Sequence, residues 1–120
     1  ITPLVVASAT DKGDKTIKVG PDAKRFRELL ASDRLSVLDF TATWCGPCQF
    51  IAPVFSRLSG QYEDVQFLKI DVDECKSIRD ACGVKAMPTF QFYRNGKQLD
   101  ELVGADSAKL QAKVAQYARK

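Results

Sequence analysis

The strongest constraint on the fold is an apolar segment at residues 35–41 that is followed at once by a helical pattern. The segment is rich in apolar and β-branched residues, and only Ser36 and Asp39 interrupt it. Such a run is typical of a strand that is buried on both faces of a sheet. Residues 45–58 then place their apolar side chains on one face of a helix. A buried strand that leads directly into a helix favours an α/β fold.

The same alternation continues along the chain. Further strands are predicted at residues 16–19, 65–72, 89–93 and 98–103, and further helices at residues 22–31, 74–81 and 107–119. Asn95-Gly96, a dipeptide favoured in tight hairpin turns, joins the last two strands. We therefore expect an α/β fold with a central mixed sheet of about five strands, flanked by about four helices.

Length and charge restrict the classes of protein to consider. A chain of 120 residues has room for one domain. The net charge, 18 − 15 = +3, does not by itself argue for binding to nucleic acid or to a membrane. Residues 1–15 are expected to form a flexible N-terminal leader, and residues 16–120 the folded domain. The alternative for the leader is the tail of a secretory signal, which Ala7-Ser8-Ala9 faintly resembles.

The chain contains no histidine and four cysteines. Without histidine there is no Ser-His-Asp triad, no Cys-His protease pair and no His-rich metal site. Chemistry near neutral pH must therefore come from cysteine, from a carboxylate or lysine with a shifted pKa, or from an unseen cofactor.

Two of the cysteines form the motif Cys45-Gly46-Pro47-Cys48, at the start of the helix that follows the buried strand. A spacing of three brings both sulfurs onto one turn, where a disulfide can form or break with little backbone movement. The unpaired N–H groups of a helix N-terminus stabilise a thiolate at Cys45. Pro47 falls in the first turn, where its missing N–H costs nothing, and it stiffens the loop between the thiols.

Zinc binding is the alternative function for this motif. With no histidine, the other two ligands would have to be Cys75 and Cys82. Their spacing of seven matches no zinc knuckle, and they fall on another predicted helix. A purely structural disulfide is also disfavoured, because the loop between the two cysteines is so short.

Three stretches together resemble the thioredoxin family: Trp44-Cys45-Gly46-Pro47-Cys48, Ala86-Met87-Pro88-Thr89-Phe90 and Val103-Gly104-Ala105. The resemblance covers residues 16–119 without interruption. It implies the thioredoxin fold and the activity of a general protein-disulfide reductase, an electron carrier that works by dithiol–disulfide exchange. It also implies that no cofactor or metal is needed, because the Cys45–Cys48 pair is itself the redox centre.

The resemblance assigns Cys45 as the nucleophile and Cys48 as the thiol that resolves the mixed disulfide. Asp39 would lie buried beneath Cys48 and accept its proton, whereas the alternative is a solvent-facing carboxylate at a sheet edge. Lys69 on the next strand would pair with Asp39, or else be a solvated strand lysine. Gly46, Pro47 and Lys69 would tune the redox properties of the pair. Gln49 stands where a lysine is usual in the family.

Four more residues would form the substrate-binding surface. Trp44 would be a partly exposed docking residue, although a core aromatic is the alternative. Pro88 would be cis after Met87 and would face the disulfide, with its neighbouring backbone able to pair with an extended target chain. Gly104 would let that chain approach closely.

Cys75 and Cys82 are candidate regulatory thiols, for oxidative control or dimerisation. If both lie on one helix, they are about 10 Å apart along its axis, so an intramolecular bridge would need the helix to distort. The alternative is that they are semi-buried small apolar residues.

The expected partners are a thioredoxin reductase that depends on NADPH or ferredoxin, and target proteins that contain a disulfide. We expect no binding to nucleic acid or to a membrane. The protein is expected to be a monomer. Two other functions are weighed: an oxidase or isomerase for secreted proteins, against which Pro47 argues, and a non-catalytic binding subunit. We expect a cytoplasmic location. An organelle matrix or stroma, or export after removal of a presequence, are the alternatives because the chain does not start with Met.

Overall fold

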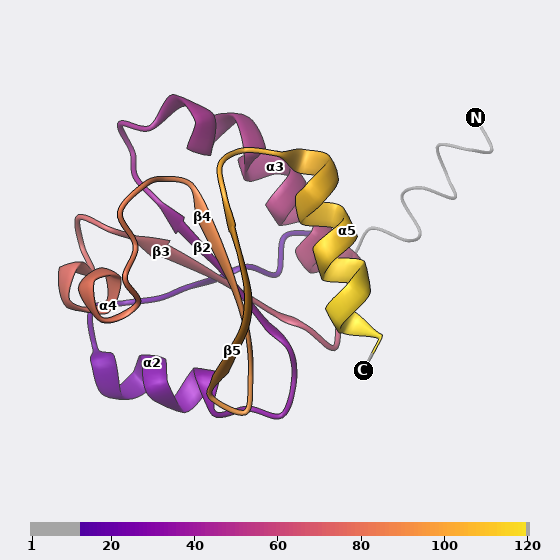
Figure 1. Cartoon of the computed structure of the whole chain (residues 1–120), viewed down its shortest axis with the longest axis horizontal. Coiled ribbons are helices and arrows are strands. Elements are labelled where there is room, and N and C mark those ends of the chain that lie inside the picture. The colour runs from indigo at the N-terminus through magenta and orange to yellow at the C-terminus, as the bar shows by residue number, and fades with distance from the viewer. Residues whose placement is uncertain (1–12, 120) are drawn as a thin grey trace.

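The computed structural model describes residues 13–119, which fold as a sheet between two layers of helices (Figure 1). The elements in chain order are β1 (Ile17–Lys18), α2 (Ala23–Leu30), β2 (Ser36–Thr41), α3 (Gly46–Gln61), β3 (Gln66–Asp71), α4 (Lys76–Ala81), β4 (Thr89–Arg94), β5 (Lys97–Val103) and α5 (Ser107–Ala118). The predicted α/β fold with a five-stranded mixed sheet and four helices is confirmed.

The sheet has the strand order β1-β3-β2-β4-β5. The strands β1, β3 and β2 run parallel, and β4 and β5 are antiparallel to their neighbours. β2 lies in the centre, and all six of its residues are buried. The register places Asp39 opposite Lys69 on β3 and opposite Phe90 on β4. The apolar run at residues 35–41 is therefore the central strand, as its composition predicts.

Two hydrophobic cores lie on the two faces of this sheet. One core contains buried side chains of α2 and α4 together with Leu38 and Phe40 of β2. The other contains buried side chains of α3 and α5 together with Val37 of β2. Because side chains alternate along a strand, Asp39 shares the face of Val37, under α3. Figure 1 shows α3 and α5 on one side of the sheet and α2 and α4 on the other.

The ends of the elements follow local chemistry. Asp22 caps α2 as predicted, since its carboxylate accepts hydrogen bonds from the backbone of Lys24 and Arg25. The hairpin between β4 and β5 turns at Asn95 and Gly96, which both have positive φ angles of 56° and 75°. No helix in residues 13–119 is long and apolar enough to cross a membrane.

The expected leader falls mostly outside the described residues, because the structure describes nothing before Gly13. Asp14 and Lys15, at its end, are attached to the domain. The backbone N–H of Lys15 donates to the hydroxyl of Ser59 on α3 at 2.9 Å. Contacts with the domain are therefore already made by residues before Thr16.

Candidate active site

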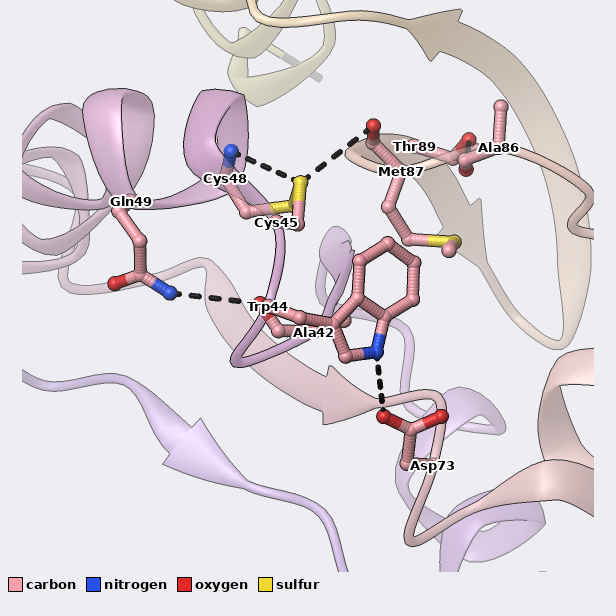
Figure 2. Close-up of a disulfide and its surroundings, with 9 residues drawn as sticks. All are labelled: Ala42, Trp44, Cys45, Cys48, Gln49, Asp73, Ala86, Met87 and Thr89. Atoms are coloured by element: carbon pink, nitrogen blue, oxygen red, sulfur yellow. Dashed lines mark hydrogen bonds between the residues drawn. A yellow bond between two sulfur atoms is a disulfide. The ribbon is translucent and has the colours of Figure 1, made fainter.

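The first turn of α3 carries the two cysteines of the motif, which are joined by a disulfide (Figure 2). Cys45 is the N-cap of the helix, and the backbone N–H of Cys48 donates to Cys45 Sγ at 3.2 Å. Their Cα atoms are 5.3 Å apart, within the usual range for a disulfide. Pro47 stands in the first turn, where no N–H is required. This helix terminus directs an N–H and a partial positive charge at Cys45 Sγ, which favours a thiolate there once the disulfide is reduced.

The two sulfur-bearing residues differ slightly in exposure. Cys45 is 5% exposed and Cys48 is 2% exposed, so both are buried and Cys45 is the more accessible. This order agrees with the expectation that Cys45 is the more exposed of the two thiols. The backbone that covers Cys45 comes from the loop before β4, where the Met87 carbonyl oxygen lies 3.7 Å from Cys45 Sγ.

That loop has the geometry expected from the sequence. The Met87–Pro88 peptide bond is cis. The hydroxyl of Thr89 donates to the carbonyl of Ala86 at 2.6 Å and so ties the loop to the start of β4. The N–H of Gly104 donates to the Pro88 carbonyl at 2.9 Å, and its φ of +106° is one that residues with a side chain rarely adopt. The structure therefore brings Met87, Pro88 and Gly104 together beside the disulfide.

Trp44 lies beside the disulfide on the surface and is 65% exposed, so the alternative of a core aromatic is wrong. Its indole N–H donates to Asp73 at 2.8 Å (Figure 2). Asp73 was not among the predicted site residues, and the 29 residues between the two leave no local sequence signal. Phe50 in α3 is also missing from the prediction, and at 75% exposure it adds a second large apolar side chain to this end of the molecule.

Asp39 is buried, with 3% of its surface exposed, so the alternative of a solvent-facing carboxylate is wrong. Its Oδ1 atom has no hydrogen-bond partner among the described residues. Burial raises the pKa of Asp39 from its usual 3.8 to about 7, and the positive charge of Lys69 offsets part of this effect. A carboxyl group with such a pKa can both accept and release a proton near neutral pH.

Lys69 lies on the same face of the sheet, opposite Asp39 in the β2–β3 register. Its side chain is exposed, and the ion pairs within residues 13–119 do not include one between Lys69 and Asp39. The predicted pairing is thus not a direct contact. Lys69 acts on Asp39 electrostatically, through space, because its positive charge lowers the pKa of Asp39.

Two cavities with shared walls adjoin this carboxyl group and Cys48. Asp39 lines a cavity of about 280 Å³ beneath α3. Cys48 lines a neighbouring cavity of about 200 Å³. Both cavities are lined by Gln49, Ala52 and Lys69. Each is large enough for water, which occupies about 30 Å³ per molecule in the liquid.

Cys75 and Cys82 are free cysteines at the two ends of α4. Cys75 is buried, and its thiol donates to the Val19 carbonyl at 3.5 Å, whereas Cys82 is half-buried. Burial raises the pKa of both thiols. Across residues 13–119, no group of three or more His, Cys, Asp or Glu side chains could hold a metal ion, so the zinc alternative has no set of ligands there.

These features together define a class of protein. A redox-active Cys-x-x-C pair stands at a helix N-terminus, a cis-proline loop covers the first cysteine, and a buried carboxyl group lies behind the second. Such a site can exchange its disulfide with a thiol or disulfide of another molecule. The protein is therefore a thiol–disulfide oxidoreductase.

Comparisons with known proteins identify the family within this class. The family model described as Thioredoxin matches residues 17–116. Thioredoxin of Mus musculus is 46% identical over 104 residues, which cover 85% of this chain and 99% of the relative. Thioredoxin-1 of Schizosaccharomyces pombe is 46% identical over 98 residues, which cover 82% of this chain and 95% of the relative.

Solved structures agree with the sequence comparisons. The crystal structure of Malassezia sympodialis thioredoxin superimposes with a TM-score of 0.83 at 42% identity, covering 90% of this chain and 94% of that one. The chain belongs to the thioredoxin family. It acts by thiol–disulfide exchange through Cys45 and Cys48, and like other thioredoxins it needs no cofactor besides this pair.

Proposed function

We propose that Cys45 attacks the disulfide of a target protein and that Cys48 then releases the reduced target. The Cys45 thiolate attacks one target sulfur, a mixed disulfide forms, and the other target sulfur leaves and takes up a proton. Cys48 loses its proton, its thiolate attacks Cys45 Sγ, and the second target thiol is released. Two electrons and two protons pass to the target, and the Cys45–Cys48 disulfide remains.

The observation that carries this assignment is the asymmetry between the two cysteines. Cys45 is the N-cap of α3 and accepts the N–H of Cys48, whereas Cys48 lies deeper, on a cavity that adjoins the one containing Asp39. The helix terminus thus favours the thiolate of Cys45. Cys48 has no such stabilisation, so Asp39 acts as its proton acceptor, through water in the adjoining cavities.

Trp44, Met87, Pro88 and Gly104 form the proposed target-binding surface. Trp44 is exposed beside Cys45, and Met87 presents its carbonyl to Cys45 Sγ. Gly104 leaves open space where a side chain would stand. An extended target chain can therefore pair with the backbone at this loop by β-addition. The short rigid loop formed by Gly46 and Pro47 tunes the reduction potential of the cysteine pair, and so does the charge of Lys69.

The oxidised protein needs a reductase to return it to the dithiol, and we propose one that draws electrons from NADPH or ferredoxin. We also propose that the protein is a monomer in a reducing compartment such as the cytoplasm. The two cysteines outside the active site are free thiols, which a reducing compartment maintains.

The test measures reduction of a disulfide-bonded protein by dithiothreitol, with and without this chain. The wild type should accelerate the reduction, and Cys45→Ser should be inert. Cys48→Ser that has been reduced beforehand and freed of dithiothreitol should accumulate a covalent complex with the target through Cys45. Cys82→Ser is the matched control, because it removes a half-buried thiol that forms no disulfide. Full turnover by either active-site variant would refute the assignment.

The reductase partner is tested separately. The oxidised chain is mixed with an NADPH-dependent or a ferredoxin-dependent thioredoxin reductase, and the appearance of thiols is followed. Reduction by one of the two identifies the class of electron donor, and reduction by neither would contradict this part of the proposal.

A further inference from the structure

The segment just before β1 is attached to the C-terminal part of α3. The N–H of Lys15 donates to Ser59 Oγ at 2.9 Å, and the N–H of Thr16 donates to Asp14 Oδ1 at 2.9 Å, which closes a small turn. Ser59 is 2% exposed, and its oxygen lies 3.5 Å from Asp14 Oδ1. Residues 14–16 are therefore held against α3 by contacts that span more than 40 positions of sequence.

This segment forms one wall of the cavity that contains Asp39. Asp14 and Thr16 line that cavity together with Asp39 and Lys69. Asp39 Oδ1 and Thr16 Oγ1 are the two buried side-chain polar atoms of residues 13–119 that lack a hydrogen-bond partner in good geometry. Both belong to residues that line the same cavity, so the segment and the carboxyl group share one compartment.

We propose that residues 14–16 act as a strap that covers the Asp39 cavity and limits the access of solvent to this carboxyl group. Asp14 and Ser59 are then positioning residues for the proton transfer at Asp39: Asp14 holds the turn of the strap, and Ser59 fastens the strap to α3. The inference rests on the proposed role of Asp39 in the reaction.

The charges around the cavity are consistent with this arrangement. Desolvation is the largest influence on the pKa of Asp39, which it raises, and Lys69 opposes it. Hydrogen bonds from Thr16 lower the pKa of Asp14, so Asp14 is a carboxylate at every pH where Asp39 titrates. The residues of α3 that line the cavity are uncharged: Gln49, Ala52, Pro53, Phe55 and Ser56. Burial is thus the main influence on Asp39, the strap forms one wall of its cavity, and Asp14 and Lys69 are the facing charges.

The strap lies outside the part of the chain that the family model matches, which starts at residue 17. Residues 14–16 thus act on Asp39 from outside the Cys45–Cys48 motif.

The experiment titrates the side-chain carboxyl carbon of Asp39 by NMR in the full-length oxidised protein, with the resonance assigned by its loss in Asp39→Asn. Asp14→Ala and Ser59→Ala each loosen the strap, and each should lower the pKa of Asp39 by about one unit because water reaches the carboxyl group. Asp22→Ala is the matched control, since Asp22 is another exposed carboxylate that caps local backbone N–H groups, at α2. It should leave the titration unchanged.

One further variant distinguishes the covering of the Asp39 cavity by the strap from the effect of the negative charge of Asp14. Asp14→Asn keeps the oxygen that accepts the Thr16 N–H but removes the negative charge. If the strap acts by covering, this variant shifts the pKa of Asp39 less than half as far as Asp14→Ala. Equal shifts in both Asp14 variants, or no shift in Ser59→Ala, would overturn the proposal.

This titration does not depend on catalysis. A wild-type rate of target release in Asp39→Asn would defeat the proposed role of Asp39, yet the strap would still be judged by the pKa of Asp39 alone. The two failures are thus distinguishable.

Discussion

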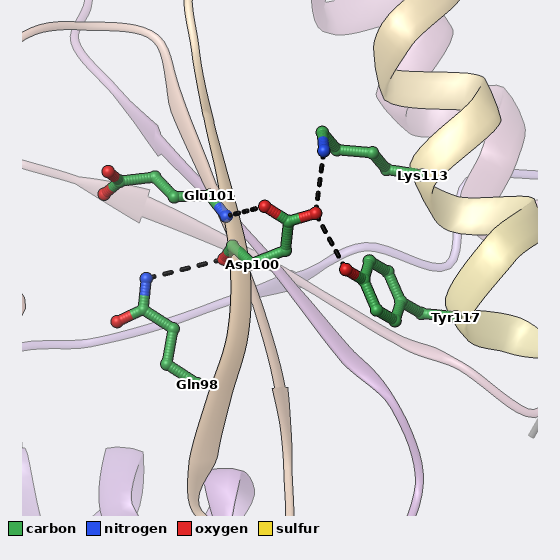
Figure 3. Close-up of polar contacts among 5 residues, drawn as sticks. All are labelled: Gln98, Asp100, Glu101, Lys113 and Tyr117. Atoms are coloured by element: carbon green, nitrogen blue, oxygen red, sulfur yellow. Dashed lines mark hydrogen bonds and ion pairs between the residues drawn. The ribbon is translucent and has the colours of Figure 1, made fainter.

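Two carboxyl groups, Asp39 and Asp100, lie on the same face of the sheet, the face covered by α3 and α5. They differ in their hydrogen-bond partners, and their pKa values are shifted in opposite directions. Asp100 on β5 receives hydrogen bonds from Lys113 at 2.7 Å, from the Tyr117 hydroxyl at 2.8 Å and from the Glu101 N–H at 2.7 Å (Figure 3). Asp39 on β2 is more deeply buried, and its Oδ1 has no partner.

The pKa of each of the two carboxyl groups depends on its hydrogen-bond partners. The hydrogen bond from Lys113 is the largest influence on the pKa of Asp100 and lowers it below its usual value. Burial without such partners raises the pKa of Asp39 to about 7. Partners, as well as depth, therefore decide what a carboxyl group can do: Asp100 stabilises the attachment of α5 to β5, whereas Asp39 retains a proton that it can exchange.

The largest expected effect comes from Asp39→Asn. In the unfolded chain Asp39 titrates near 3.8, and in the folded protein near 7. Between these values the folded protein holds a proton that the unfolded chain has released, so stability falls as pH rises. The wild type should lose up to roughly 4 kcal/mol between pH 4 and pH 8 through this group, and Asp39→Asn should not. Denaturant unfolding of the oxidised protein at both pH values measures the difference.

The same variant should slow release of the target by roughly tenfold at pH 7, less than the full range for general acid–base catalysis because water can also take the proton. Single-turnover decay of the mixed disulfide measures this rate. Identical pH dependence of stability in wild type and variant would mean that Asp39 behaves like an ordinary surface carboxyl group and does not differ from Asp100 in this way.

Asp100→Asn should change the free energy of unfolding in the opposite pH range, and by less than Asp39→Asn. Because the folded pKa of Asp100 is lowered, its stabilisation is present above the unfolded value and is lost as pH falls through the folded one. We expect a loss of about 1 kcal/mol at pH 7, since solvent reaches the pair and weakens it. The free energy of unfolding at pH 7 and pH 3 checks this, and target reduction should be unchanged. A clear loss of activity would show that the two carboxyl groups are not separate in function.

The smallest expected effect is that of Tyr117→Phe. The substitution removes one of the three donors to Asp100 but keeps the ring that packs against Phe92, with centroids 5.7 Å apart. The denaturation midpoint should fall by less than in Asp100→Asn. A larger fall would mean that the hydroxyl, and not Lys113, is the main partner of Asp100.

Most of the fold and the centre of the site could be predicted from the sequence, because their signals are local. The period of the apolar residues predicts β2 and α3, and the cysteine motif marks the helix start between them. Asp39 is visible as a charge within an apolar strand. Its pKa could not be predicted, because that depends on how α3 and β3 pack around it.

Contacts between distant parts of the chain could not be predicted in the same way. Lys113 and Tyr117, four residues apart, are expected to share a face of α5. That they meet Asp100 depends on how the helix lies across the sheet. The attachment of Lys15 to Ser59 uses a backbone N–H, which every residue except proline possesses, so no side-chain pattern indicates it.

The arrangement of the active site also keeps the proposed path of electrons apart from that of protons. In the proposed reaction electrons leave through Cys45, beside Trp44 and the Met87 loop. The cavity of Asp39 is lined by neither Trp44 nor Met87, and residues 14 and 16 form part of its wall. A partner docked on Cys45 can therefore cover the sulfur without contacting the cavity of the acid, so tight docking and turnover need not compete.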